Sequence, residues 1–272
     1  MKKYTVIMTI AGSDSGGGAG IQADLKTIEA LGGYGTSVIS AITAQNTQGV
    51  NAIHPIPTDI ILKQFEAIAE DMEISALKTG MLHNSETIEV VSECIKKYGI
   101  KKVVVDPVMI STSGHKLIED NTIKTLKTKL IPLAEIITPN LDEAEVLLNK
   151  KIATPKDMEE ASLKLMDLGC KCALVKGGHL TSENIVDVYY NLKKEQAISI
   201  ESKKINTLNT HGTGCTLSAA IATMLGKNYN LDEAILKSHN YLYGALLSGK
   251  DYKLGKGFCP LHHSYQNNIS DN

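Results

Sequence analysis

The sequence predicts an α/β fold in which a central, mostly parallel sheet is flanked by helices on both faces, in a single domain over residues 1–272. Short apolar runs alternate along the chain with segments whose apolar residues recur at helical spacing, which is typical of a parallel sheet covered on both faces. No linker, repeat or low-complexity stretch interrupts this alternation. Polar residues follow the apolar runs, at the strand ends where open α/β sheets bind their ligands.

In the first half of the chain, apolar runs predict strands at 4–10, 34–44, 76–81 and 101–106. Helices are expected between them because apolar residues there fall on one helical face. These helices lie around Ile21, Leu25 and Ile28, over 59–72 and over 88–98.

The second half continues the pattern with a helix at 123–130, a strand at 134–138 and a helix that opens at Asn140–Glu143, after Pro139. A helix over 158–168 ends at Gly169 and precedes a strand at 170–175. Two segments of alternating polarity, 185–191 and 196–202, predict a hairpin on the edge of the sheet. Two helices close the chain, and the first of them stops at Gly226.

Composition narrows the class of protein. The net charge is −2 without a basic stripe, which argues against nucleic acid and anionic membrane as partners. No apolar run approaches the roughly 20 residues of a membrane span, and the N-terminus is too short in apolar residues for a signal peptide. The five scattered cysteines form no Cys-x-x-Cys pair, which fits the reducing cytoplasm. All 28 basic residues are lysine, so no arginine fork can bind a phosphate.

The turn Asn209–Leu217 is the strongest sign of a site. Gly212, Thr213 and Gly214 precede an apolar helical run, so several backbone N–H groups can point one way at a helix N-terminus. Such a terminus binds anions, phosphate above all, and its field favours a thiolate at Cys215. A glycine turn before a buried helix with a buried cysteine fits this segment equally well.

A second glycine-rich loop, Gly12–Gly20, follows the first strand and opens a helix. It does not meet the strict dinucleotide pattern at any register, and it lacks the lysine of a P-loop. The looser dinucleotide form, over Gly18–Ala23, falls inside the expected helix. The loop therefore allows close approach of a ligand at Gly12 without being a recognised nucleotide cradle.

Motifs along essentially the whole chain resemble the hydroxymethylpyrimidine/phosphomethylpyrimidine kinases of thiamine biosynthesis. They are Thr9–Lys26, Ala44–Thr47, Lys78–Met81, Val105–Met109, Thr138–Asn140, Lys176–His179, the Cys215 turn, Gly255–Gly257 and Pro260–His263. The resemblance implies a three-layer ribokinase-like fold, ATP with Mg²⁺, a homodimer and two successive phosphoryl transfers. Most of that superfamily has aspartate where this chain has Cys215.

For the chemistry, the resemblance implies that the amides of Gly212, Thr213, Gly214 and Cys215 form an anion hole for the moving phosphoryl group. Cys215 is also the expected base of the first transfer, whereas the second transfer, onto an ionised phosphate, needs none. His211 is a weaker choice of base because it lies before the helix. The paired His262 and His263 are expected to be tail structure.

Substrate contacts are expected from the first half of the chain. The Gln45 amide can accept from the exocyclic amine of a pyrimidine and donate to the adjacent ring nitrogen, with a hydrogen bond to backbone at a strand end as the alternative. Asp24 is expected at the amine or hydroxymethyl group, with a plain helix-face aspartate as the alternative. Met81 and Val108 are expected to be apolar walls, with ordinary core packing as the alternative.

Asp106 and Glu143 are hard oxygen donors suited to Mg²⁺ bound through water, with a helix cap or a solvated charge as the alternative for either. Asn140 and Thr210 are expected near ATP, and Lys176 is expected to neutralise its phosphates. Residues 111–116 are a candidate lid. A pyridoxal kinase on the same scaffold and a non-catalytic pyrimidine-binding protein are the competing functions; Gln45 disfavours the first, and the joint presence of Asp106, Glu143, Lys176 and Cys215 disfavours the second.

Overall fold

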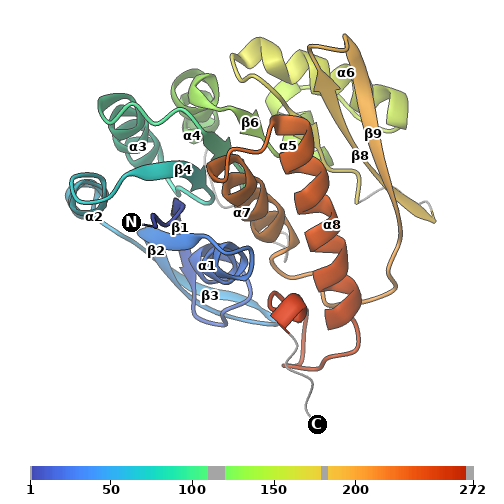
Figure 1. The fold of residues 1–272 in the computed structure, drawn as a ribbon, viewed down its shortest axis with the longest axis horizontal. Helices are drawn as coiled ribbons and strands as arrows, with labels where there is room; N and C mark the ends of the chain where they lie inside the picture. The colour runs from blue at the N-terminus through green and yellow to red at the C-terminus, as the bar shows by residue number, and fades with distance from the viewer. Residues whose placement is uncertain (1, 110–119, 179–182, 268–272) are drawn as a thin grey trace.

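A six-stranded sheet with the order β3-β2-β1-β4-β5-β6 forms the centre of the molecule (Figure 1). The structure is a computed structural model that describes residues 2–109, 120–178 and 183–267. All neighbours in the sheet are parallel except β3, which pairs antiparallel with β2 at one edge. The strands are β1 (Val6–Asp14), β2 (Tyr34–Asn46), β3 (Gly49–Pro55), β4 (Ile74–Thr79), β5 (Val103–Val105) and β6 (Ile136–Ile137).

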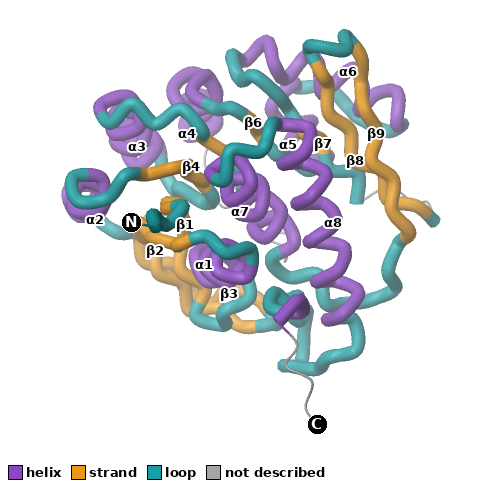
Figure 2. Tube along the Cα trace, in the orientation of Figure 1, coloured by secondary structure: helices purple, strands orange, loops and turns teal. Residues whose placement is uncertain are grey.

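At the opposite edge, a three-stranded antiparallel sheet continues the central one. Its strands are β7 (Leu174–Val175), β8 (Asn184–Asn191) and β9 (Gln196–Lys203). Single parallel bridges, Ile137 to Ala173 and Asn140 to Lys176, join the β6 side to the β7 side. The predicted edge hairpin is therefore confirmed as β8 and β9, which Figure 2 shows as two long neighbouring strands.

Three helices cover one face of the sheet: α1 (Gly20–Ala30), α7 (Thr213–Gly226) and α8 (Leu231–Gly249). The other face carries α2 (Thr58–Ala69), α3 (Ser85–Lys97), α4 (Asp120–Thr125), α5 (Leu141–Leu148) and α6 (Pro155–Lys164). A π-helical turn, η1 (Leu126–Leu130), extends α4, and the 3₁₀ turn η2 (Ile131–Leu133) follows it. Another 3₁₀ turn, η3 (Leu165–Leu168), extends α6, and a last one, η4 (Tyr265–Asn267), lies near the C-terminus. The three-layer prediction is confirmed.

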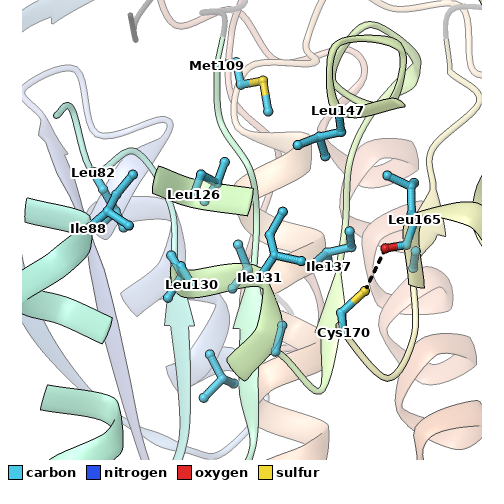
Figure 3. Close-up of a cluster of buried hydrophobic side chains, with 14 of the residues drawn as sticks. Leu82, Ile88, Met109, Leu126, Leu130, Ile131, Ile137, Leu147, Leu165 and Cys170 are labelled. Atoms are coloured by element: carbon cyan, nitrogen blue, oxygen red, sulfur yellow. Dashed lines mark hydrogen bonds between the residues drawn. The ribbon is translucent and has the colours of Figure 1, made fainter. Parts of the chain in front are cut away.

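The central strands supply both cores because successive side chains point to opposite faces of a strand. Val103 and Val105 of β5 pack in the core under α3 and α5, and Val104 packs in the core under α7 and α8. Figure 3 shows part of the first core, where Leu130, Ile131 and Ile137 lie together. Over the described residues, no helix combines the length and apolar character that a bilayer span requires.

Polar side chains fix where several helices begin. Asn84 accepts from the Thr87 N–H at the start of α3, and Asn140 with Glu143 forms a reciprocal capping box at α5. Similar boxes begin α6, at Thr154, and α8, at Asn230. The strands at 101–106, 134–138 and 170–175 are shorter than predicted, and β3 was not predicted. The proposed lid at 111–116 lies outside the described residues.

Candidate active site

A cleft of about 620 Å³ opens at the carboxyl ends of the parallel strands. Its wall brings together thirteen of the fourteen residues singled out in the sequence, from both halves of the chain. They are Gly12, Gln45, Met81, Asp106, Val108, Asn140, Glu143, Lys176, Thr210, Gly212, Thr213, Gly214 and Cys215. The exception is Asp24.

The start of α7 has the geometry of an anion site. Gly212 is the N-cap, with φ of +84°, and a Cβ there would lie 1.9 Å from the Gly18 carbonyl oxygen, so glycine is required. The first regular helical bond is from the Thr216 N–H to the Gly212 oxygen. Of the amides predicted to form the anion hole, that of Thr213 donates to the Thr210 carbonyl at 3.3 Å and is not free, whereas no hydrogen bond within the described part of the chain engages those of Gly214 and Cys215. These amides are open to a ligand, and a Cβ on Gly214 would lie only 3.2 Å from Lys176 Nζ.

Asp14 joins the two glycine turns. Its carboxylate accepts from the N–H groups of Gly16, Gly18 and Ala19 at 2.8, 3.0 and 2.8 Å, and from His211 Nε2 at 2.9 Å. Burial alone would raise the pKa of Asp14, but His211 and the loop amides outweigh burial and lower the pKa below 3.8. His211 is therefore held by a carboxylate and ties the first glycine loop to the start of α7.

Gln45 lies at the end of β2 with its backbone bonded to Ser15. The Gln45 N–H donates to Ser15 Oγ at 2.8 Å, and Ser15 Oγ donates to the Gln45 carbonyl at 2.7 Å. The Gln45 side-chain oxygen accepts from Thr43 Oγ1 at 3.1 Å, and its Nε2 lies 3.2 Å from His211 Nε2. The Thr43 contact orients the side-chain oxygen at the cleft wall, whereas His211 Nε2, which donates to Asp14, does not accept from the Gln45 amide nitrogen.

Met81 and Val108, which are both half-buried, contribute to the apolar part of the wall. A Cβ on Gly12 would lie 2.7 Å from the terminal methyl carbon of Met81. Glycine at position 12 therefore lets the methionine pack directly against the backbone of the first loop.

On the other side of the cleft, Lys176, which is partly exposed, forms an ion pair with the buried Asp106. Asp106 Oδ1 accepts from Lys176 Nζ and from Thr138 Oγ1, both at 3.2 Å. Burial would lower the pKa of Lys176, but Asp106 and Glu143 raise it, so the lysine is charged. A fixed cation beside open amides suits a polyphosphate.

Glu143 combines the two roles considered for it, because it caps α5 and also lines the cleft. Its Oε2 accepts from the Asn140 N–H at 2.8 Å, and the Asn140 side-chain oxygen accepts from the Glu143 N–H at 2.9 Å. Burial raises the pKa of Glu143 to about 7, with Lys176 opposing and Asp106 adding to the shift. The Asn140 side-chain oxygen is used by the cap, so Asn140 acts at the cleft by fixing Glu143.

The carboxylates of Asp106 and Glu143 suit the Mg²⁺ that is bound together with nucleotide phosphates. Among the described residues, no three histidine, cysteine or acidic side chains cluster as a metal cage. Asp106 and Glu143 are nevertheless two carboxylates on one cleft wall. Mg²⁺ in phosphoryl-transfer sites is usually held by one or two carboxylates, waters and the substrate phosphates.

Cys215 differs from the expectation of a thiolate. It is partly exposed at the cleft, whereas the other four cysteines are buried. Burial among neighbouring groups raises the pKa of the Cys215 thiol to about 11; Lys78 opposes this shift, and Asp24 and Asp106 add to it. The prediction of a lowered pKa was wrong, because desolvation and two nearby carboxylates outweigh the cation.

Asp24 does not reach the cleft, so the structure does not support its expected contact with substrate. Its side chain is fully buried and accepts from Lys78 Nζ at 2.8 and 2.9 Å and from Thr9 Oγ1 at 2.6 Å. Lys78 begins the Lys78–Met81 motif, but the sequence indicated no function for its side chain. Lys78 lies at the end of an apolar strand among buried neighbours, and a buried lysine needs a charged partner; this was the sequence feature that could have indicated the ion pair.

Four more residues line the cleft, and nothing in the sequence marks them as part of a binding site. Ile185 and Asp187 come from β8, and Leu242 and Leu246 come from α8. Asp187 is buried and accepts from the Gly177 N–H at 2.9 Å, so it holds the turn that follows Lys176. Only the folded chain brings these elements next to the anion site.

A helix N-terminus, a lysine and a carboxylate pair that meet in one cleft of a three-layer α/β fold define a small-molecule phosphotransferase. Residues 14–262 match the family model of phosphomethylpyrimidine kinase, and the chain belongs to this family. It is 42% identical over 262 residues to the hydroxymethylpyrimidine/phosphomethylpyrimidine kinase of Rhizobium meliloti, covering 96% of this chain and 97% of that protein.

Two solved structures show the same fold. The phosphomethylpyrimidine kinase of Clostridium difficile 630 is 46% identical with a TM-score of 0.78, over 89% of this chain and 99% of that one. An ADP complex of Bacillus subtilis pyridoxal kinase is 37% identical with a TM-score of 0.89, over 98% of this chain and all of that one. The scaffold is thus shared by kinases of two different ring systems.

Proposed function

We propose that this protein phosphorylates 4-amino-5-hydroxymethyl-2-methylpyrimidine with ATP and then phosphorylates the monophosphate to the pyrophosphate, in thiamine biosynthesis. The observation that carries the proposal is the pair of open amides at Gly214 and Cys215, beside Lys176 and in one cleft with Gln45. Family membership supports the same reaction.

In the first transfer, the hydroxymethyl oxygen forms a bond to the γ-phosphorus, and the bond from that phosphorus to the β–γ bridging oxygen breaks. ADP leaves with the electron pair, and the hydroxyl proton passes to a base. The amides at the start of α7 and the Lys176 ammonium stabilise the charge on the phosphoryl oxygens. Cys215 lies at that helix terminus and is the proposed base, while the second transfer needs none because its acceptor is already ionised.

Asp106 and Glu143 are the residues that would hold Mg²⁺ with the ATP phosphates. When bound, the ion supplies positive charge to the phosphates during transfer. Lys176 and the α7 amides supply the protein's own positive charge, in a chain that has no arginine.

For the substrate, Gln45 is proposed to bind the pyrimidine amine and the adjacent ring nitrogen, with Met81 and Val108 as the apolar walls beside the ring. Thr210 and Lys176 are proposed to contact ATP, with Asn140 acting by fixing Glu143. A homodimer in the cytoplasm is the proposed state, and the family resemblance supports it.

Pyridoxal phosphorylation is the second candidate, because the Bacillus subtilis pyridoxal kinase has the same fold. Pyridoxal lacks an amine beside a second ring nitrogen, so Gln45 favours the pyrimidine. A coupled assay of ADP release decides between them. We expect kcat/KM to be higher for the hydroxymethylpyrimidine than for pyridoxal, and the reverse order would transfer the proposal to the pyridine substrate.

A further inference from the structure

A segment near the C-terminus, residues 257–263, contacts both sides of the cleft from behind without lining it, and we call it the C-terminal strap. The motifs Gly255–Gly257 and Pro260–His263 overlap the strap, and the proposed reaction gives their residues no role. One end of the strap contacts the turn between β2 and β3, next to Gln45 (Figure 1). The other end contacts the start of α7, which carries the open amides.

The contact with the β2–β3 turn is made at Thr47. The Phe258 N–H donates to the Thr47 carbonyl oxygen at 2.9 Å, and the Gly257 N–H donates to Thr47 Oγ1 at 3.1 Å. A Cβ on Gly257 would lie 2.1 Å from that carbonyl oxygen, and a Cβ on Gly255 would lie 2.4 Å from Thr47 Oγ1. The strap therefore packs backbone against backbone at this turn, which only glycine permits at position 257.

The contacts with α7 are made just before the helix and in its first turn. The His211 N–H donates to the Cys259 carbonyl oxygen at 3.2 Å, and His211 forms a parallel bridge with Pro260. His263 Nε2 lies 3.0 Å from Thr216 Oγ1, one residue after Cys215 in the chain. The same short segment thus touches the residues on either side of the anion site.

Helix α8 anchors the strap. Tyr241 Oη donates to the His263 carbonyl oxygen at 2.6 Å, and the His262 N–H donates to the Ala245 carbonyl oxygen at 3.2 Å. Leu261 is buried. Because the strap is fixed on a helix of the core, a displacement at its contact with Thr47 would move the turn and not the strap.

The β2–β3 hairpin has few other contacts that fix its end. Every residue of β3 is at least partly exposed. The pairing of β2 with β3 also shifts register beside the site, because Ala44 pairs with Ala52 whereas Gln45 pairs with Val50. Such a shift locally disrupts the ladder and changes the direction of a side chain. The position of Gln45 therefore depends on what holds the turn two residues later.

We propose that Thr47 and Gly257 are positioning residues of the pyrimidine site, which set the distance from the Gln45 amide to the open amides of Gly214 and Cys215. The strap holds both ends of this span, and a reacting hydroxyl must be placed accurately against the phosphoryl group. This role deepens the proposed function and rests on it, because Gln45 is assigned there to the pyrimidine. The contact between the strap and the turn does not depend on the substrate.

The test is a double-mutant cycle of Gly257→Ala and Gln45→Leu in the full-length protein. The φ of Gly257 lies outside the left-handed region, so the added methyl group acts through its clash with Thr47 and not through backbone strain. We expect Gly257→Ala to raise KM for the pyrimidine about tenfold, and to have little effect when Gln45 is already leucine. KM for ATP should stay near the wild-type value. Lys253→Ala, at an exposed position just before the strap, is the matched control and should leave both KM values unchanged.

Thr47→Val is the second variant, in case Gly257→Ala does not fold. It removes the hydroxyl that accepts from the Gly257 N–H and keeps the branched shape, so KM for the pyrimidine should rise by about three- to fivefold. Amide hydrogen exchange gives a readout that needs no substrate. We expect faster exchange at residues 46–49 and at Phe258 in both variants, with wild-type exchange in the β8–β9 hairpin.

Unchanged exchange at the turn, an unchanged KM, or a rise in KM of equal size in the Gln45→Leu background would each overturn the proposal. Faster exchange at the turn of an enzyme that does not phosphorylate the pyrimidine would instead overturn the proposed function, and would leave the contact between the strap and the turn intact.

Discussion

Cys215 is surrounded by charges of both signs, and this decides how it can act. With a thiol pKa of about 11, the side chain is protonated at neutral pH. It can remove a proton only through the small thiolate fraction, whereas its backbone N–H can bind a phosphoryl oxygen at any pH. The two roles therefore respond differently to substitution and to pH.

Replacing Cys215 with Ser or Ala separates the two roles. We expect the first phosphorylation to slow by about 10²–10⁴-fold, the usual contribution of a general base, and the second to change far less. Each step is measured separately, with the alcohol or its monophosphate as substrate. Equal losses in both steps would show that Cys215 is only a structural part of the anion hole.

The pH dependence of the first transfer gives an independent check. A base with a raised pKa is active when deprotonated, so the rate should rise with pH through the range below about 11. The expected slope of log kcat/KM between pH 7 and 9.5 is about one, because the thiolate fraction grows about tenfold per pH unit. The second transfer should be nearly flat over the same range, and a flat profile for both would argue against the thiolate.

Gln45 is the residue on which ring discrimination depends. Gln45→Leu removes an acceptor and a donor at a fixed position, which should lower kcat/KM for the pyrimidine by about 10–100-fold. The same change should affect pyridoxal much less. Parallel assays of both substrates measure this, and equal losses would indicate that the amide only supports the loop at Ser15 and Thr43.

At the scale of elements, the start of α7 depends on two glycines for different reasons. Gly212 has a positive φ and packs directly against the carbonyl of Gly18, so it joins two loops. Gly214 faces Lys176 and Asp106, and a Cβ there would lie 3.2 Å from Lys176 Nζ and 3.5 Å from Asp106 Oδ2. The first glycine maintains the fold, and the second keeps the anion site open.

Alanine substitutions distinguish these two roles. Gly214→Ala should keep the melting temperature near that of the wild type and lower kcat/KM by about 10–100-fold, because the methyl group misplaces the phosphate. Gly212→Ala should lower the melting temperature strongly as well. Gly99→Ala is the control: its φ is +64° with no atom within 4 Å of the added Cβ, so about 1–2 kcal/mol of stability should be lost with activity unchanged. A Gly214→Ala enzyme with full activity would contradict the assigned anion site.

At the scale of the whole molecule, the layers were predictable because apolar periodicity reports burial directly. The three valines of the predicted strand at 101–106 became β5, which is buried on both faces, and Gly226 ended α7 as expected. The edge strand β3 was missed because its exposed, mixed residues have no periodic apolar pattern. Capping also has a clear local signature, and the cap was an alternative considered for Glu143 before the structure showed it at Asn140.

Within the site, the residues at strand ends were predictable because topology alone collects them at one edge. What could not be predicted was the partner of each charge. Asp24 lies near the start of α1 and could face the cleft or the sheet, and only the packing of β4 against β1 places Lys78 beside it. The direction in which the pKa of the Cys215 thiol is shifted likewise depended on burial and on charges from three distant segments.

The central claim is that one cleft performs two successive phosphoryl transfers onto a hydroxymethylpyrimidine. Mass analysis of the products formed with 4-amino-5-hydroxymethyl-2-methylpyrimidine, ATP and Mg²⁺ tests it most directly. We expect a product with one added phosphoryl group that is converted, over time, to one with two. An unchanged pyrimidine in an experiment where pyridoxal gains a phosphoryl group would contradict it.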